Sequence, residues 1–167
     1  MGKVEEARKF LELVGMPKAQ QADTCCYVLL AMADIKPDMP WNEAKNDWIR
    51  IHDIIQFANT FYGTTYAENS RETFRKQALH RFRAAALVED NGMATNSPNY
   101  KYRITEETLA MLKTFQSVEW QKSLERFLTY HKKLVDIYAS KKKMTMMPVK
   151  INGAVFFCKV CRAGGFV

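Results

Sequence analysis

The fold class is set by residues 69–104, whose sequence is NSRETFRKQALHRFRAAALVEDNGMATNSPNYKYRI. The first half has apolar side chains at helical spacing, so one arc of a helix over about residues 69–87 would face a core. The apolar residues of this arc are Phe74, Ala78, Leu79, Phe82, Ala85 and Ala86. We expect Asn69 to cap the helix, with the Glu72 side chain bonding back to the N–H of the cap.

The second half predicts two strands around a long polar loop. Residues 89–92 and 96–99 are turn-forming runs, and residues 100–104 alternate in the two-residue period of a half-buried strand. Helix, strand, polar loop and strand is the element order of a winged helix-turn-helix, whose second helix enters the major groove of DNA. We therefore predict a mainly α fold with a recognition helix at about 69–87 and a β-wing at about 87–104.

The candidate DNA-binding residues are polar side chains on the wing and opposite the core arc of the helix. On the helix they are Thr73, Lys76, Gln77, His80, Arg81 and Arg83, and on the wing they are Asn96, Ser97, Asn99, Lys101 and Arg103. We expect Lys76, Gln77 and His80 to approach base edges, because Gln pairs with adenine and Lys with guanine. For His80, plain solvent exposure is an equally good interpretation. Thr73 and Arg83 are expected near phosphates.

The flanking segments predict further helices. Helical apolar spacing runs through residues 3–14, 23–33 and 49–62, and the last of these would support the recognition helix. Beyond the wing, Thr105 followed by two glutamates favours another helix start. A longer helix is expected over about 118–140. Its apolar side is one narrow stripe that consists of Trp120, Leu124, Phe127, Leu128, His131, Leu134, Val135 and Tyr138.

The apolar stripe must be buried against another surface. The candidates are the chain's own domain, a second subunit in a homodimer, and a following domain; we expect the stripe to pack partly on its own domain. Residues 1–143 are thus predicted to form one helical winged-helix domain. Residues 144–167 are predicted to form a basic and apolar tail outside the packed domain, with short strand-like pieces at 148–151 and 154–157.

The formal net charge of +7 is distributed unevenly along the 167 residues. Residues 1–68 hold seven Lys and Arg against ten Asp and Glu, a net of −3, whereas residues 69–103 hold seven against three, a net of +4. Residues 141–167 add six Lys and Arg with no acid. Basic helix faces are often simply solvated, but this charge coincides with the predicted winged helix, and together they favour a nucleic-acid partner.

The cysteine content and the hydropathy of the chain indicate in which cellular compartment the protein is expected. No run approaches the roughly 20 apolar residues of a membrane span, and residues 1–10 lack the apolar segment of a signal peptide. Cys25 and Cys26 are expected to be reduced core residues, while Cys158 and Cys161 form a lone C-x-x-C without the other ligands of a structural zinc site. We therefore expect a cytosolic, reducing compartment and no metal or cofactor in this chain.

Catalytic residues are not expected. The pattern nearest to a magnesium nuclease is Asp38 followed by Glu43 and Lys45, but it lies in a turn, whereas such nucleases hold the metal with carboxylates from neighbouring strands. The three histidines are scattered, and no motif pairs one of them with a serine or cysteine nucleophile. The chain also has no glycine-rich phosphate loop.

Four stretches carry a family resemblance: residues 16–21 (MPKAQQ), 36–41 (KPDMPW), 71–77 (RETFRKQ) and 96–102 (NSPNYKY). In this order they resemble the N-terminal domain of BsuBI/PstI-type restriction endonucleases, and the likeness extends to about residues 150–153. The resemblance implies a helical and winged-helix region followed by a Mg²⁺-dependent nuclease domain of the PD-(D/E)xK type. It also implies a type II enzyme of the prokaryotic cytoplasm that cuts the palindrome CTGCAG and is paired with a protecting methyltransferase.

After Gly153 the chain departs from the family pattern, because residues 154–167 do not continue into a nuclease. We therefore predict a DNA-binding module whose partner is duplex DNA containing CTGCAG, with Mg²⁺ confined to the absent nuclease domain. Such a chain is either an excised domain or the product of a shortened or frameshifted gene.

Two other interpretations remain open. A small-molecule-responsive transcriptional regulator also combines a winged helix with a long terminal helix, through which it dimerises, and effector-dependent dimerisation would favour it. A winged helix that serves only as a protein-interaction layer would show no measurable affinity for duplex DNA at moderate salt.

Overall fold

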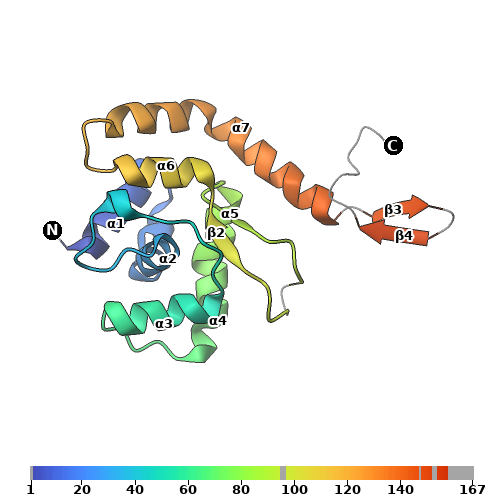
Figure 1. Ribbon diagram of the computed structural model, residues 1–167, viewed down its shortest axis with the longest axis horizontal. Coiled ribbons are helices and arrows are strands. Elements are labelled where there is room, and N and C mark those ends of the chain that lie inside the picture. The colour runs from blue at the N-terminus through green and yellow to red at the C-terminus, as the bar shows by residue number, and fades with distance from the viewer. Residues whose placement is uncertain (1, 95–96, 147, 152–153, 158–167) are drawn as a thin grey trace.

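The computed structural model describes residues 2–94, 97–146, 148–151 and 154–157. These residues form a mainly helical domain with two small antiparallel sheets (Figure 1). The α-helices are α1 (Lys3–Leu13), α2 (Asp23–Ala33), α3 (Ile51–Phe61), α4 (Arg71–Phe74), α5 (His80–Ala84), α6 (Glu106–Thr114) and α7 (Trp120–Met146). Short 3₁₀ turns are η1 (Lys18–Gln21), η2 (Trp41–Glu43) and η3 (Glu68–Ser70), and η4 (Arg75–Leu79) is a turn of π-helix. The strands are β1 (Val88–Asp90), β2 (Tyr102–Ile104), β3 (Pro148–Ile151) and β4 (Ala154–Phe157).

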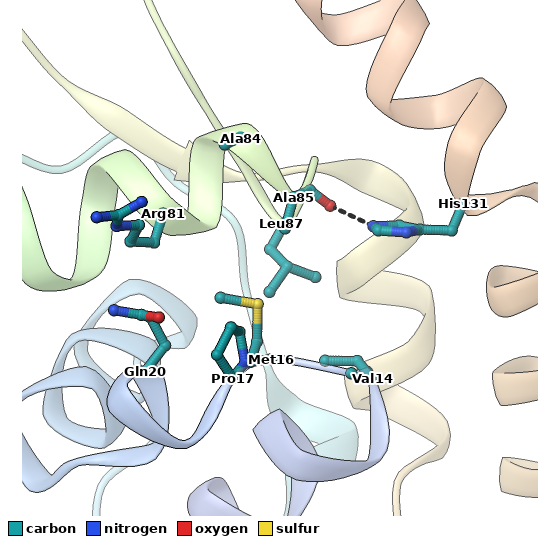
Figure 2. Close-up of a pocket in the computed structure, with 10 residues that line it drawn as sticks. Val14, Met16, Pro17, Gln20, Arg81, Ala84, Ala85, Leu87 and His131 are labelled. Carbon is teal, nitrogen blue, oxygen red and sulfur yellow. Dashed lines mark hydrogen bonds between the residues drawn. The ribbon is translucent and has the colours of Figure 1, made fainter.

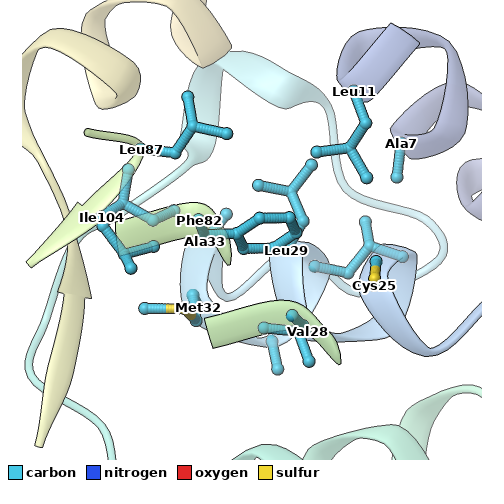
Figure 3. Close-up of a cluster of buried hydrophobic side chains, with 14 of the residues drawn as sticks. Ala7, Leu11, Cys25, Val28, Leu29, Met32, Ala33, Phe82, Leu87 and Ile104 are labelled. Atoms are coloured by element: carbon cyan, nitrogen blue, oxygen red, sulfur yellow. The ribbon is translucent and has the colours of Figure 1, made fainter. Parts of the chain in front are cut away.

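The central helix of the core is α2. Its sequence is apolar on all sides, which is typical of a helix surrounded by neighbours, and it contacts α1, α3 and the π turn η4. Every residue from Val28 to Ala33 is buried. Side chains of α2, among them Leu29 and Ala33, lie around Phe82 of the recognition helix (Figure 3). The recognition helix is therefore held by the same core as the helices that precede it.

The predicted winged helix is confirmed. The η3 turn leads from α3 into a continuous recognition helix made of α4, η4 and α5. Across the wing, β1 pairs antiparallel with β2, from Val88 opposite Ile104 to Asp90 opposite Tyr102. On the other side of β2, Ile49 exchanges backbone hydrogen bonds of 2.8 and 2.9 Å with Tyr102. Three backbone segments thus form the sheet that carries the wing.

Asn69 does not cap the recognition helix, contrary to the prediction. The 3₁₀ turn η3 includes Asn69, and Ser70 becomes the N-cap residue with a helical backbone (φ −75°, ψ −5°). A side-chain cap needs an extended backbone at this position, so the helix start has none. Glu72 instead accepts hydrogen bonds of 2.6–3.1 Å from the Arg75 guanidinium.

The recognition helix ends at a left-handed residue, Ala86, whose φ is 62°. The N–H of Ala86 bonds to the carbonyl of Arg83 at 3.0 Å, and the N–H of Leu87 reaches back to the carbonyl of Phe82 at 2.8 Å. These bonds satisfy carbonyls at the helix end and turn the chain. Leu87 then enters the core and the chain continues directly into β1, which places the wing against the end of the helix.

The apolar stripe of α7 packs largely on its own domain, as expected. Its buried or half-buried residues are Trp120, Leu124, Phe127, His131, Leu134, Val135 and Tyr138. The ring of His131 hydrogen-bonds to the carbonyl of Ala85 at 2.8 Å, and the Tyr138 hydroxyl donates to Glu107 of α6 at 2.6 Å. Leu128 lies at the edge of the stripe and is 47% exposed. The stripe is therefore mainly an intradomain contact.

The chain after residue 140 continues α7 and then forms a hairpin. α7 reaches Met146, past its expected end, and β3 pairs antiparallel with β4 from Pro148 opposite Phe157 to Ile151 opposite Ala154. The two predicted strand-like pieces are confirmed, and their hairpin lies beyond the end of α7 (Figure 1). Asn96, Cys158 and Cys161 fall outside the described residues.

Candidate nucleic-acid interface

The recognition helix has a buried face and an exposed face, as predicted. The residues without exposed surface are Phe74, Ala78, Leu79 and Phe82. On the opposite side, Thr73, Lys76, Gln77 and Arg81 are exposed and His80 is half-buried. Among the described residues, no carboxylate lies within ion-pair distance of Lys76 or Arg81. In the described part of the chain these two cations thus form no direct ion pair, although the Glu72 carboxylate, which pairs with Arg75, also interacts electrostatically with Lys76.

A π turn lies in the middle of the recognition helix. The N–H of His80 bonds to the carbonyl of Arg75, five residues back instead of four. Such turns are frequent at functional sites, and the 3.6-residue period of a sequence does not reveal them. Here the turn carries Lys76 and Gln77, two of the three side chains expected at base edges.

Arg83 connects the recognition helix to the wing. Its guanidinium pairs with Asp90, whose side chain is only 2% exposed, and donates to the Tyr100 hydroxyl at 3.0 Å. Tyr100 also donates to Asp90 at 3.0 Å, and the N–H of Gly92 bonds to the same carboxylate at 2.9 Å. Burial disfavours the charged form of Arg83, but Tyr100 and Asp90 outweigh it and raise its pKa. Arg83, expected near a phosphate, is thus occupied within the protein.

Arg103 is also held by the protein, on the other strand of the wing. It donates to Glu89 at 2.9 Å, and its guanidinium lies 4.6 Å from the centre of the Trp48 ring. Stacking on an aromatic face and pairing with an acid both fix an arginine in place. Arg103 therefore braces β2 against β1 and against the segment before α3.

The described residues on both sides of the wing loop hydrogen-bond to one another through polar groups. The Asn91 side chain donates to the carbonyl of Asn99 at 2.7 Å, and the N–H of Asn99 bonds to the Ser97 hydroxyl at 3.0 Å. The Asn99 side chain is exposed, and Lys101 is half-buried. The wing thus presents Ser97, Asn99 and Lys101 from a loop with internal hydrogen bonds.

Two exposed cations near this surface are missing from the sequence-based set. Arg71 is exposed on the first turn of α4, and its place in the basic run could have indicated it. Lys18 is exposed on η1, which packs against the π turn. No local pattern relates η1 to the recognition helix, because the contact joins residues 57 positions apart, Gln20 and Gln77.

A cavity of about 270 Å³ borders the C-terminal end of the recognition helix (Figure 2). Met16 and Pro17 from the α1–η1 connection form one wall, and Ala84 and Leu87 form the other. Arg81 also lines it, and His131 lines it from α7. The walls are mainly apolar, and the polar side chains that line the cavity are those of Gln20, Arg81 and His131.

No group of three or more His, Cys, Asp and Glu side chains in the described part of the chain could hold a metal ion. Within the described residues, no helix combines the length and the apolar character needed to cross a membrane.

Comparison with known proteins agrees with this architecture. Residues 1–136 match the profile of the BsuBI/PstI restriction endonuclease HTH domain. The chain is 37% identical over 152 residues to the type II restriction enzyme BsuBI of Bacillus subtilis, which covers 89% of this chain and 48% of that protein. It is 31% identical over 149 residues to the type II restriction enzyme AplI of Arthrospira platensis, covering 87% and 46%. The chain thus spans about half the length of these curated relatives.

A solved structure shares the fold. The SdaI restriction endonuclease superposes with a TM-score of 0.73 at 23% sequence identity, over 92% of this chain and 50% of that one. The profile covers most of the chain, including every element from α1 to the recognition helix and the wing. The chain therefore belongs to the BsuBI/PstI restriction endonuclease family and carries its N-terminal helix-turn-helix domain.

Proposed function

We propose that this chain is the DNA-recognition module of a BsuBI/PstI-type restriction endonuclease, and that it binds duplex DNA without cutting it. The observation that carries the proposal is the exposed basic face of the recognition helix, which lies beside a wing in a domain of this family. A recognition helix in the major groove can read base edges, and basic side chains on either side contact phosphates. The proposed setting is the prokaryotic cytoplasm, where restriction enzymes meet DNA.

The contacts on the helix are assigned by their place on the face opposite the buried arc, and those on the wing by their place in its polar loop. Lys76, Gln77 and His80 approach base edges, and Thr73 and Arg81 contact the phosphates. On the wing, Ser97, Asn99 and Lys101, with Asn96, follow the backbone. Arg83 and Arg103 support this surface from within, because their guanidinium groups pair with Asp90 and Glu89.

The proposed target is the palindrome CTGCAG, which the family resemblance implies. A palindrome is read by two copies of a recognition helix, one for each half-site. Because the stripe of α7 is mainly covered by its own domain, a second copy would have to be held by another surface. The nuclease activity is assigned to the half of the relatives that this chain does not span.

Replacing Gln77 by Ala should weaken binding to the preferred site by about 1–3 kcal/mol and leave binding to random duplex nearly unchanged. The reason is that a glutamine amide can form two hydrogen bonds to adenine, which random sequence does not consistently offer. Gln121→Ala changes an exposed glutamine on α7 and serves as the control. Fluorescence anisotropy with both duplexes measures the effect. An equal loss on both sequences would remove Gln77 from base readout.

The purified chain should bind duplex DNA in the presence of Mg²⁺ and leave it uncut. Binding should weaken steeply as salt rises, because neutralising phosphates with Lys and Arg releases counterions. Titration of the chain against duplex DNA at several salt concentrations, with gel analysis of a plasmid incubated with Mg²⁺, tests both parts. Absence of binding at low salt would refute the recognition role. Cleavage that follows the protein peak through purification would refute the assignment of catalysis to the other half of the enzyme.

A further inference from the structure

One buried polar side chain joins the recognition helix to the helices before it. Gln20 of η1 is 8% exposed, and its Nε2 donates to the main-chain oxygen of Gln77 at 3.3 Å. A buried amide without a partner is costly, so this hydrogen bond holds Gln20 and Gln77 in a defined relation. The two residues are 57 positions apart in the chain.

A second donor reaches the same carbonyl. The Cys25 thiol of α2 lies 3.4 Å from the oxygen of Gln77. Burial raises the pKa of this thiol to about 11, so it remains protonated and can donate at neutral pH. Both donors come from the part of the chain before α3, and both meet the helix inside the π turn. Side chains that bond to carbonyls inside a helix are typical of places where the regular helical ladder is interrupted.

The residue held in this way also carries a proposed base-reading side chain. The Gln77 backbone faces η1 and α2, while its side chain is exposed. A hydrogen bond to a base edge needs a donor–acceptor distance of roughly 3 Å and a donor–hydrogen–acceptor angle close to linear. Long cationic side chains that meet phosphates tolerate a small rotation of the helix, but a bidentate glutamine does not.

We propose that Gln20 is a positioning residue for sequence discrimination. Its hydrogen bond fixes the backbone of the π turn in the recognition helix, and this orients the side chains of Gln77 and its neighbour Lys76 toward the bases. This inference rests on the proposed DNA-recognition function. It assigns to Gln20 no contact with DNA. Its role is to preserve the difference in affinity between the preferred site and other sequences.

The test compares Gln20→Met with Gln21→Met. Both changes keep the side-chain length and remove one side-chain amide from η1. Gln21 donates to the carbonyl of Met16 at 2.9 Å, so its loss breaks a bond in the same turn that does not involve the recognition helix. The preferred site is first defined by selection from randomised duplexes with the unaltered chain, and the affinities of all three proteins are then measured on that site and on random duplex.

Gln20→Met should lower the ratio of the two affinities by about 2- to 10-fold, the range that the loss of one hydrogen bond supports, with little change on random duplex. Gln21→Met should leave the ratio unchanged. Amide hydrogen exchange without DNA is a second measurement, and exchange in residues 75–84 should be faster in Gln20→Met than in Gln21→Met.

The outcomes separate the two hypotheses. If the unaltered chain binds both duplexes equally, the proposed sequence recognition is wrong and the inference fails with it. If the unaltered chain discriminates and Gln20→Met discriminates as well, only the positioning role is overturned. Equal weakening on both duplexes with a lowered Tm would reduce Gln20 to a stabilising residue. Unchanged hydrogen exchange would show that the Gln20–Gln77 bond does not hold the π turn.

Discussion

Phe82→Ala should lower the free energy of unfolding by about 3–5 kcal/mol, the cost of removing a fully buried aromatic ring from a core. Phe82 has no exposed surface, and it lies at the centre of the cluster formed by α2, the recognition helix and β2 (Figure 3). The surrounding side chains belong to helices and a strand that hold each other in place, so they can close only part of the resulting cavity. Denaturant unfolding followed by circular dichroism measures the loss.

Phe61→Ala is the matched control for this prediction. It removes the same ring at the end of α3, where Phe61 is 39% exposed, and should therefore cost clearly less. If Phe82→Ala unfolded at the same denaturant concentration as the unaltered chain, the recognition helix would be rotated from the orientation described. The assignment of its exposed face would then be wrong as well, because the two faces are fixed together.

Asp90→Ala should destabilise the domain by about 3 kcal/mol, the lower end for removing one partner of a buried ion pair. The substitution leaves the guanidinium of Arg83, whose side chain is 27% exposed, without its acid. It also removes the acceptor for the Tyr100 hydroxyl and for the N–H of Gly92. The remaining solvent access of Arg83 keeps the loss below that of a fully buried pair. Thermal unfolding at neutral pH measures it.

Glu89→Ala provides the comparison on the same strand. The Glu89–Arg103 pair is more open, with side-chain exposures of 17% and 31%, so its loss should cost less than about 1 kcal/mol. Asp90→Ala should also weaken DNA binding more than Glu89→Ala, because Asp90 fixes both the end of the recognition helix and the start of the wing. Equal stability of the two variants would mean that Asp90 is not the anchor of the wing.

The internal arginine pairs change the interpretation of the basic segment. Residues 69–103 carry a net charge of +4, but Arg75, Arg83 and Arg103 each pair with a nearby carboxylate. The charge available to a phosphate is therefore concentrated on side chains such as Lys76 and Arg81. A count of basic residues identifies the surface, and the pairing pattern identifies which residues on it are free to bind.

The local sequence accounts for the elements of this fold. The apolar spacing of the recognition helix predicts its buried face correctly, because the period of an α-helix is a local property of the backbone. Thr105 predicts the start of α6 correctly, and its hydroxyl accepts from the N–H of Thr108, since a cap and its partner lie within one turn of each other. The polar run between β1 and β2 likewise indicates the wing.

The rest does not follow from the spacing of apolar residues. The 3₁₀ turn that displaces the Asn69 cap is closed by a bond from the Ser70 N–H to the Ala67 carbonyl, and Arg83 pairs with Asp90 across the turn from helix to wing. The hydrogen bond from Gln20 to the π turn joins distant segments and depends on the packed fold. A spacing pattern reports which side of a helix is apolar, but it contains no distance between residues 57 positions apart. The helices, the strands and the buried face of each helix thus follow from short-range geometry. Which arginines pair within the protein, and how the recognition helix is oriented, is decided only when the chain is packed.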